Sequence, residues 1–380
     1  MPFKYFLNEP YLEGNEKKYL SEVIDNRWLS AGGNLTKQFE EKFADHIGLK
    51  YCLAVQSGTA ALHTALLALG IKQKDKVIIP NYTCSACATS VIQAGADPVI
   101  IDVEKETFGL NFDDVKVAIE ELDDIKAIMP VHVYGFPLKD FSKIISLAKE
   151  KGIFILEDTS EAHGATLKGK KLGSFGDLSA FYIRSEKMLG VGEGGVVLTD
   201  NKNLHDKALF YASRGCDFNP KENQWWERYY YKAVGMNYKL PHALGAIALA
   251  QMENFPRILQ IKRSIGEKYA ELLRNEPEII LQRRIDNSEP VYWLNAIVLK
   301  NKTKEEVREI GKKLIEKQIE IRPGFWPLGD LEYLKKYSFG TQEKGNYLFD
   351  HMIILPSSVN LAKNDFDGVI EITSALKELL

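Results

Sequence analysis

An excess of charge of either sign is absent from this sequence. Its 49 Lys and Arg residues are balanced by 52 Asp and Glu residues, which gives a net charge of -3. A protein that binds nucleic acid through the phosphates carries a basic excess, so we expect no nucleic-acid partner. Hydrophobic residues make up 45% of the 380 residues, which is typical of a globular protein with a large core. The length predicts about two domains.

Long apolar runs are also missing. No run approaches the roughly 20 residues that a membrane helix requires. The first residues, MPFKYFLNEPYLEGNEKK, lack the apolar core of a signal peptide. We therefore expect a cytoplasmic protein without a membrane partner. Internal repeats and low-complexity tracts are absent too.

Cysteine is scarce. Cys52, Cys84, Cys87 and Cys216 are too few and too scattered for a disulfide framework, which is consistent with a reducing compartment. Cys84 and Cys87 form a CxxC pair, a pattern found in redox and zinc sites. Zinc would need a second pair at similar spacing, and Cys52 and Cys216 do not supply it. We expect no metal, and we interpret the pair as small apolar residues on a buried helix.

Short apolar runs alternate with helical patterns along the first half of the chain. Strands are predicted at 51–55, 76–80, 98–102, 125–133 and 153–156, and helices at 16–26, 85–94, 138–151 and 203–214. This alternation predicts a parallel α/β sheet with right-handed crossovers. Further on, 242–252 and 258–274 predict two helices separated at Pro256, and 292–299 predicts another strand.

The stretch 154–195 contains the residues with the clearest chemistry. Asp158 follows a buried strand, at the end of a parallel sheet where ligands bind, and Lys187 precedes a glycine cluster. Such an Asp and such a Lys are the two groups that a pyridoxal phosphate site needs, one for the ring nitrogen and one for the Schiff base. Taken singly, a strand-end Asp is commonly a helix cap, and an exposed Lys is commonly just solvated.

Two glycine-containing segments suggest phosphate binding. The letters SGT at 57–59 begin a predicted helix, whose free N–H groups favour a phosphate at Gly58 and Thr59. A plain N-cap by Ser57 or Thr59 explains the same letters, and the residues alone leave both interpretations open. The glycines of 190–195 formally match the dinucleotide fingerprint, but the strand-like VVLTD after them excludes it, because that fingerprint must open a helix.

The motifs together resemble a known family. EDTSEAHG, GSFGD, a Lys ten residues after that Asp, and GEGG five residues after the Lys resemble the DegT/DnrJ/EryC1/StrS sugar aminotransferases. The resemblance runs from about Pro10 to the last predicted helix. It implies an α/β fold, the fold type I of pyridoxal-phosphate-dependent transferases. Its large domain, 20–255, has a mostly parallel seven-stranded sheet flanked by helices, and a smaller α+β domain takes 1–19 and 256–380.

The resemblance implies pyridoxal 5'-phosphate as cofactor, with Lys187 and Asp158 as catalytic residues. Cofactor contacts are implied for Gly58, Thr59, Cys84, Asp158, Glu161, Tyr182, Lys187 and Asn237. The chain departs from the family at four places. Cys84 replaces an aromatic residue, and Tyr182 replaces a phosphate-binding Ser. Arg184 and its neighbours in RSE replace the usual residues before the Lys, and Gly190 replaces a Thr. These departures leave open a catalytically inert binding or regulatory protein with the same fold.

The reaction that the resemblance implies is amino transfer from L-glutamate to a nucleotide-linked keto sugar, specifically a 4-keto-6-deoxyhexose. This reaction serves the biosynthesis of amino sugars for surface polysaccharides such as O-antigen and lipopolysaccharide. Lys187 argues against sugar dehydration, because family members of that kind carry His at this place. A carbonyl substrate without a nucleotide stays open as an alternative.

Substrate contacts and a partner subunit are implied as well. The implied substrate-binding residues are Trp28, Ser30, Arg228, Lys239, Arg322, Phe325 and Trp326. The element around Asn237 is implied to reach into the neighbouring subunit, which predicts a homodimer with shared active sites. The sequence determines neither the sugar, nor its nucleotide, nor the carbon that is aminated.

Overall fold

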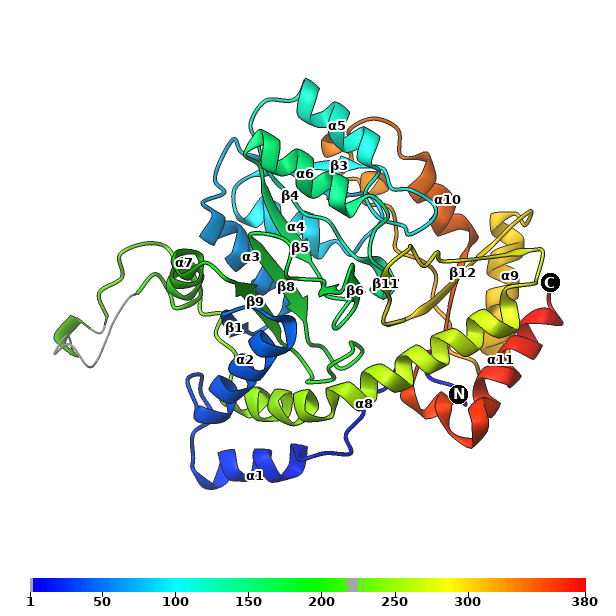
Figure 1. Cartoon of the computed structure of the whole chain (residues 1–380), viewed down its shortest axis with the longest axis horizontal. Coiled ribbons are helices and arrows are strands. Elements are labelled where there is room, and N and C mark those ends of the chain that lie inside the picture. Colours follow the sequence, from blue (N-terminus) through cyan, green and yellow to red (C-terminus); the bar gives the residue numbers. More distant parts are fainter. Residues whose placement is uncertain (1–2, 217–224, 228) are drawn as a thin grey trace.

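A seven-stranded sheet forms the centre of the fold (Figure 1). The computed structural model describes residues 3–216, 225–227 and 229–380. The strand order is β1-β9-β8-β5-β4-β2-β3. The strands are β1 (Tyr51–Val55), β2 (Lys76–Pro80), β3 (Asp97–Ile101), β4 (Ile125–Ile128), β5 (Phe154–Asp158), β8 (Leu178–Tyr182) and β9 (Gly195–Thr199). All of them but β9 run in one direction, which confirms the mostly parallel sheet.

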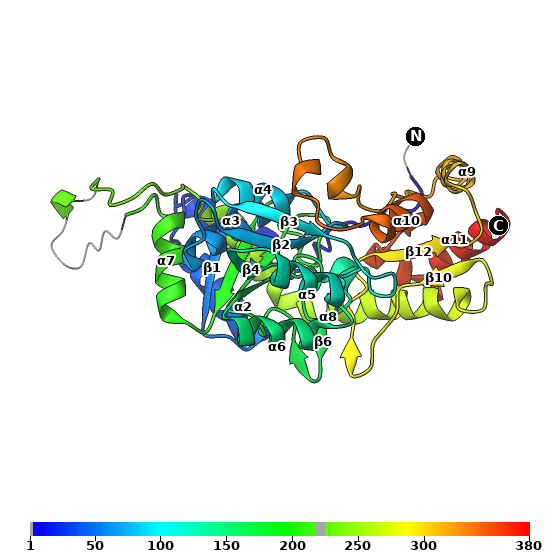
Figure 2. The same cartoon turned by 90° about the horizontal axis from the view of Figure 1, so that it is seen from above.

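Helices cover both faces of this sheet because its strands are apolar on both sides. Figure 2 shows α3 and α4 on one side of the strands and α6 on the other. The helices are α1 (Glu16–Asp25), α2 (Asn34–Ile47), α3 (Gly58–Leu69), α4 (Ala86–Gln93), α5 (Phe112–Glu121), α6 (Phe141–Lys151) and α7 (Lys202–Ala212). The helices predicted at 16–26, 85–94, 138–151 and 203–214 are therefore confirmed as α1, α4, α6 and α7.

A smaller antiparallel sheet forms from the C-terminal part of the chain. It contains β10 (Ile279–Leu281), β12 (Asn295–Leu299) and β13 (Met352–Leu355), and the helices beside it are α9 (Lys304–Glu316), α10 (Glu343–His351) and α11 (Asp367–Lys377). A third sheet joins β11 (Ser288–Glu289), β6 (Thr166–Leu167) and β7 (Lys170–Lys171). A separate hydrophobic cluster, with Ile265, Leu299 and Leu314 among its members, lies against the small antiparallel sheet. The domain division at residues 20 and 255 stays a prediction.

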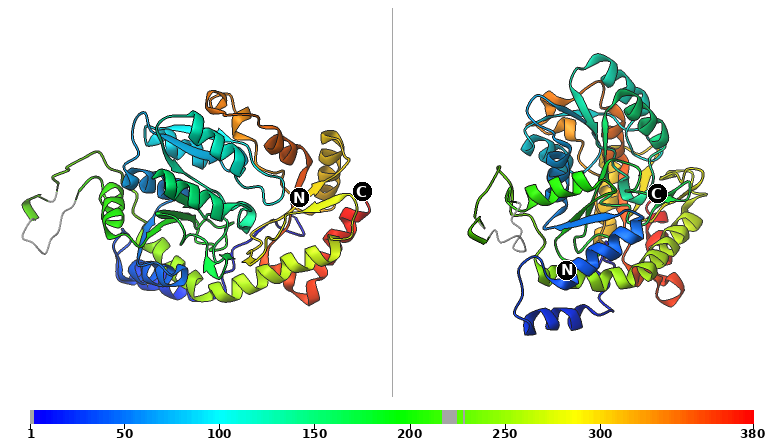
Figure 3. Two further views of the ribbon diagram at one scale, coloured as in Figure 1. Left: turned by 45° about the horizontal axis from the view of Figure 1, so that its top comes forward. Right: turned by 60° about the vertical axis from the view of Figure 1, so that its left-hand side comes forward.

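One helix, α8 (His242–Leu273), replaces the two that we predicted. It continues through Pro256 over 32 residues, and Figure 3 shows it extending along one side of the molecule. A proline inside a helix removes one backbone hydrogen bond, but Leu249 and Phe255 before it and Ile265 after it are buried. Packing on both sides of the proline therefore holds the helix together. Despite this length, no helix among the described residues is both long and apolar enough to cross a membrane.

Two predicted strands are shorter than we expected. The strand predicted at 125–133 ends at Ile128, and the one predicted at 292–299 begins at Asn295. Tyr134 and Tyr292 both have positive φ angles, of 53° and 51°, which are incompatible with an extended strand. The backbone therefore turns at the ends of both apolar runs.

The GSFGD motif wraps around the end of β5 through Glu157. This carboxylate is fully buried and accepts hydrogen bonds from the N–H groups of Gly173 (2.7 Å), Phe175 (2.6 Å) and Gly176 (2.7 Å). Gly173 has a φ of +90°, and a Cβ there would lie 2.5 Å from the Phe181 ring. The motif therefore requires glycine for steric reasons, and its spacing is set by the three donors that Glu157 satisfies.

We expect Glu157→Ala to lower the free energy of unfolding by about 3–5 kcal/mol, because one buried and two partly buried N–H donors lose their acceptor. Urea unfolding at a fixed protein concentration measures the effect. The control is Glu150→Ala on α6, whose side chain is 69% exposed and which we expect to stay within about 0.5 kcal/mol of the wild type. Equal stabilities for the two variants would contradict this account of the motif.

Candidate active site

Asp158 lies at the carboxyl end of β5, the edge where open parallel sheets bind ligands. Its side chain is buried, with a residue exposure of 5%. The Cys87 thiol on α4 donates to Oδ2 at 3.3 Å, and the Ser160 N–H donates to Oδ1 at 3.0 Å. These contacts fix the orientation of the carboxylate. We interpreted Cys87 only as a small apolar residue, so its contact with Asp158 was missed.

Lys187 lies in the loop between β8 and β9, with a side chain that is 11% exposed. Its Nζ donates to Oε1 of Glu161 at 3.1 Å and lies 3.3 Å from the ring centroid of Trp293. The other oxygen of Glu161 accepts from the Tyr134 N–H at 2.8 Å. Burial raises the pKa of Glu161, and the charge of Lys187 opposes that rise. The amine is thus held between a carboxylate and an aromatic face.

The turn at Tyr134 positions both contacts of this amine. Its positive φ directs its N–H to Glu161, and its carbonyl oxygen accepts from the Trp293 N–H at 3.1 Å. Gly135 follows with a φ of +95°, and a Cβ there would lie 2.5 Å from Val291. Trp293 was not among the residues predicted for the site, because it lies too far along the chain from Tyr134 and Lys187 for any local pattern to connect them.

The N-terminus of α3 has the geometry of a phosphate site. Ser57 caps the helix, since its Oγ accepts from the Ala60 N–H at 3.1 Å. The N–H groups of Gly58 and Thr59 belong to the first turn and have no intrahelical acceptor. A Cβ at Gly195 would lie 2.4 Å from the Ser57 carbonyl oxygen, so glycine lets β9 approach this turn closely. Ser57 is thereby confirmed as the N-cap. The N–H groups of Gly58 and Thr59 keep no intrahelical acceptor, and their binding of a phosphate stays a prediction.

Tyr182 packs its ring beside this helix turn. A Cβ at Gly58 would lie 2.8 Å from the Tyr182 Cβ and Cγ. The Tyr182 hydroxyl donates to Glu193 Oε2 at 2.7 Å, and Glu193 also pairs with Arg184 Nε at 3.3 Å. Burial, followed by the Glu193 contact, raises the pKa of Tyr182. The hydroxyl therefore has a carboxylate partner here, and its role toward a phosphate stays a prediction.

Two predicted cofactor contacts remain, Cys84 and Asn237. Cys84 lies before α4, and Asn237 lies near the edge strand β1. The Cys84 side chain is exposed. Asn237 bridges to Ser213, and Lys239 bridges to Val55 at the end of β1. The segment 237–240 thus runs beside β1 within its own chain. Arg228 lies outside the described residues.

The predicted substrate residues fall into two groups. Phe325 stacks on Tyr134 with ring centroids 5.5 Å apart and planes inclined by 14°, so it belongs to the surroundings of Lys187. Its neighbour Trp326 is 53% exposed. Trp28 and Ser30 are exposed in the loop between α1 and α2. The Lys187 amine contacts Glu161 and Trp293 instead.

Arg322 pairs with Glu186, the residue before Lys187. Its Nη2 and Nη1 donate to the two carboxylate oxygens at 2.9 Å and 3.2 Å. The Arg322 contact lowers the pKa of Glu186. The letters RSE depart from the family, but no local pattern indicates a partner for Glu186, because Arg322 comes from a distant segment.

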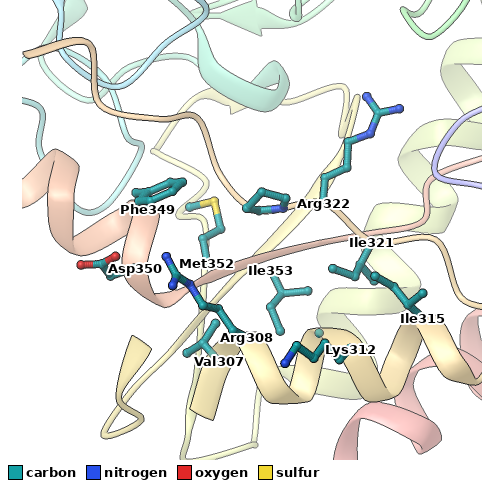
Figure 4. Close-up of a pocket in the computed structure, with 12 residues that line it drawn as sticks. Val307, Arg308, Lys312, Ile315, Ile321, Arg322, Phe349, Asp350, Met352 and Ile353 are labelled. Atoms are coloured by element: carbon teal, nitrogen blue, oxygen red, sulfur yellow. The ribbon is translucent and has the colours of Figure 1, made fainter. Parts of the chain in front are cut away.

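A pocket of about 440 Å³ lies between α9 and β13 (Figure 4). Val307, Ile315 and Met352 contribute apolar surface to it. Arg322 is the predicted site residue in its lining, but Figure 4 shows the Arg322 guanidinium directed away from the other labelled side chains. The pocket is therefore distinct from the surroundings of Lys187.

These residues fit pyridoxal phosphate. Asp158 offers a buried carboxylate, Lys187 an amine, and the α3 N-terminus N–H donors with glycines at the positions of close approach. Among the described residues, no group of three His, Cys, Asp or Glu side chains is arranged for a metal ion. The individual roles of these residues stay predictions.

Comparison with known proteins identifies the family. The model of the DegT/DnrJ/EryC1/StrS aminotransferase family matches residues 10–374. GDP-perosamine synthase of Escherichia coli O157:H7 is 36% identical over 330 residues, which cover 87% of each chain. GDP-perosamine synthase of Vibrio cholerae is 34% identical over 370 residues, which cover 97% of each chain.

A solved structure supports the same assignment at the level of the fold. Escherichia coli GDP-4-keto-6-deoxy-D-mannose-3-dehydratase with bound hydrated PLP superposes with a TM-score of 0.90, over 99% of this chain and 100% of that one, at 22% identity. Fold type I, inferred above from four short motifs, is confirmed by this superposition and by the family match. The chain therefore belongs to the DegT/DnrJ/EryC1/StrS aminotransferase family and is an aminotransferase that uses pyridoxal phosphate.

Proposed function

We propose that the protein transfers an amino group from L-glutamate to a nucleotide-linked keto sugar, specifically a 4-keto-6-deoxyhexose. The placement of the Lys187 amine between Glu161 and Trp293 is the observation that carries the transamination. Buried Asp158 belongs to the same surroundings, since burial and also the charge of Asp158 raise the pKa of Glu161. The two relatives named GDP-perosamine synthase support the sugar substrate. Amino-sugar biosynthesis for a surface polysaccharide, such as an O-antigen or lipopolysaccharide, is the corresponding pathway role.

The residues would hold the cofactor in the following way. Asp158 would pair with the ring nitrogen, Lys187 would bind the carbonyl carbon, and the N–H groups of Gly58 and Thr59 would bind the phosphate. When bound, pyridoxal phosphate supplies an electron sink for the carbon that loses or gains a proton. Cys87 and Ser160 keep the Asp158 carboxylate oriented, because each donates to one of its oxygens.

Proton transfer falls to Lys187. A free amine at this position can take a proton from one atom and return it to another, which is a general acid/base task. Glu161 accepts from Nζ at 3.1 Å and Trp293 covers the amine, so the direction of the nitrogen is restricted and access of water is limited. This arrangement favours an enzyme over the inert binding protein that the four departures left open.

The substrate groups require partners of opposite character. A diphosphate brings about two negative charges, for which Arg228, Lys239 and Arg322 are the proposed cations. A nucleobase needs an aromatic or apolar surface, which we assign to Phe325, Trp326 and Trp28. Phe325 is held by its stack on Tyr134, and exposed Trp326 is 4.6 Å from Phe349 between ring centroids.

We also propose a homodimer with shared sites. Tyr230 and Val234, in the chain between α7 and α8, are 64% and 84% exposed, which is unusual for large apolar side chains unless a partner covers them. Asn237 follows directly and is the residue that we assign to the neighbouring subunit's site.

A cytoplasmic location fits these proposals. Cys52 and Cys87 are buried thiols, and Cys84 is an exposed one, without a disulfide among the three. Unoxidised thiols of this kind are typical of a reducing compartment.

We expect borohydride reduction of the yellow holoenzyme to fix the cofactor on Lys187 alone. Peptide mapping by mass spectrometry identifies the labelled lysine. Lys187→Met should carry no label. Its activity should fall at least about a hundredfold, because the general acid/base group is gone. Lys171→Met serves as control, since Lys171 is half-buried and contacts His46 instead. A label on another lysine would end the assignment.

We expect the enzyme to aminate a nucleoside diphosphate-linked 4-keto-6-deoxyhexose when L-glutamate is present. Mass spectrometry of the amino sugar measures this. The parallel substrates are a keto sugar phosphate and a cyclitol ketone. Turnover of these alone would leave the aminotransferase assignment intact and refute the nucleotide sugar.

Shared sites predict complementation between two inactive variants. Mixed dimers of Lys187→Ala and Asn237→Ala chains contain one intact site, so random reassociation should recover about a quarter of wild-type activity. Denaturing and refolding the variants together, with each variant alone as control, measures this. Without recovery, Asn237 acts within its own chain or not at all.

A further inference from the structure

Glu186, the residue before Lys187, contacts three separate segments of the chain. Its carbonyl oxygen accepts from Asn8 Nδ2 and from Trp293 Nε1, both at 2.6 Å. Its carboxylate accepts two hydrogen bonds from Arg322. The backbone of Glu186 is therefore fixed independently of its side chain, so the carboxylate can exchange its partner without moving Lys187.

The Arg322 pair has the geometry with which proteins bind a free carboxylate. A guanidinium that donates two parallel N–H groups to two oxygens recognises planar acids. The side chains are 45% and 34% exposed, so a dissolved anion can reach them. Exposed ion pairs contribute little to stability, so such a pair is easily exchanged.

Arg322 stays in place when Glu186 leaves. Its backbone exchanges two hydrogen bonds with Ile354 of β13, at 2.8 Å and 3.2 Å. Glu320 Oε1 lies 3.6 Å from Nη2, and Glu320 is itself fixed by the Leu7 N–H at 2.8 Å. The guanidinium therefore stays at the edge of the small sheet as a preformed anion site.

We propose that Glu186 is an intramolecular competitor for the amino donor, which occupies Arg322 until a carboxylate of L-glutamate displaces it. This inference rests on the proposed function. A carboxylate bound to Arg322 takes the position of the Glu186 side chain. That side chain lies near Lys187, since the pKa of Glu186 is lowered by Arg322 and also by the charge of Lys187. The group displaced from Arg322 is the Glu186 carboxylate. A site that fits a carboxylate favours L-glutamate over a diphosphate as the ligand that binds Arg322 first. The sugar nucleotide enters the same site only after the donor has left.

Binding of glutarate to the purified holoenzyme tests this exchange, because glutarate has the two carboxylates of the donor and no amine to react. Isothermal titration calorimetry measures the Kd. We expect Glu186→Gln to lower the Kd for glutarate about two- to tenfold, because the competing charge is gone while the shape is kept. Arg322→Gln should raise it about tenfold or more, since the two-point donor is lost.

A matched control removes the same charge elsewhere. Glu106→Gln breaks a surface pair with Lys139 and Arg283, and we expect it to leave the Kd for glutarate unchanged. A purely structural role of Glu186 predicts weaker glutarate binding in Glu186→Gln, the opposite sign. Equal or weaker binding, or no measurable binding in either protein, overturns the proposal. Tighter binding of GDP without tighter binding of glutarate overturns the choice of donor as occupant.

A separate measurement distinguishes failure of this inference from failure of the proposed function. Addition of L-glutamate to the wild-type holoenzyme should convert the visible absorption band of the cofactor to the band of its aminated form. Absence of that change refutes the amino donor and with it the proposed function. If the change occurs and Glu186→Gln binds glutarate no more tightly than the wild type, only the competitor role of Glu186 is wrong.

Discussion

The placement of one partly desolvated amine is the constraint on which the site depends. Lys187 is 11% exposed, and a buried charge is tolerated only when it is paired and hydrogen-bonded. Glu161 supplies the charge and Trp293 the aromatic face. Both are positioned by Tyr134, whose left-handed backbone directs its N–H to the one and its carbonyl to the other. A single strained turn thus fixes the environment of the reactive nitrogen.

The small sheet contributes directly to this environment. Trp293 and Arg322 both reach the loop of Lys187 from the C-terminal part of the chain. Asn8 reaches it from the N-terminal segment, and its side-chain oxygen accepts from Lys262 Nζ at 2.9 Å. Burial lowers the pKa of Lys262 to about 7. The loop is therefore anchored by groups outside the large sheet that carries it.

Two acidic residues at the carboxyl end of β5 have separate roles, one in folding and one in the candidate active site. Glu157 faces the GSFGD turn and satisfies three backbone donors, whereas the next residue, Asp158, belongs to the cofactor site. Successive side chains of a strand point to opposite faces, so adjacent acids reach different surroundings. Structural and catalytic requirements are thereby separated by one residue.

The sequence by itself determined the parallel sheet, the strand-end position of Asp158 and the glycine-bounded position of Lys187, because apolar period, turn residues and motif spacing are local properties. It also predicted the helix start at Gly58, where small residues and a capping Ser are adjacent. Only the tertiary structure decided that α8 continues through Pro256, since burial on both sides of the proline comes from distant segments. The same holds for the contacts of Lys187 with Glu161 and Trp293 and of Glu186 with Arg322. Those pairs join residues far apart in the chain, and no local pattern in the sequence records which distant side chains the fold will bring together.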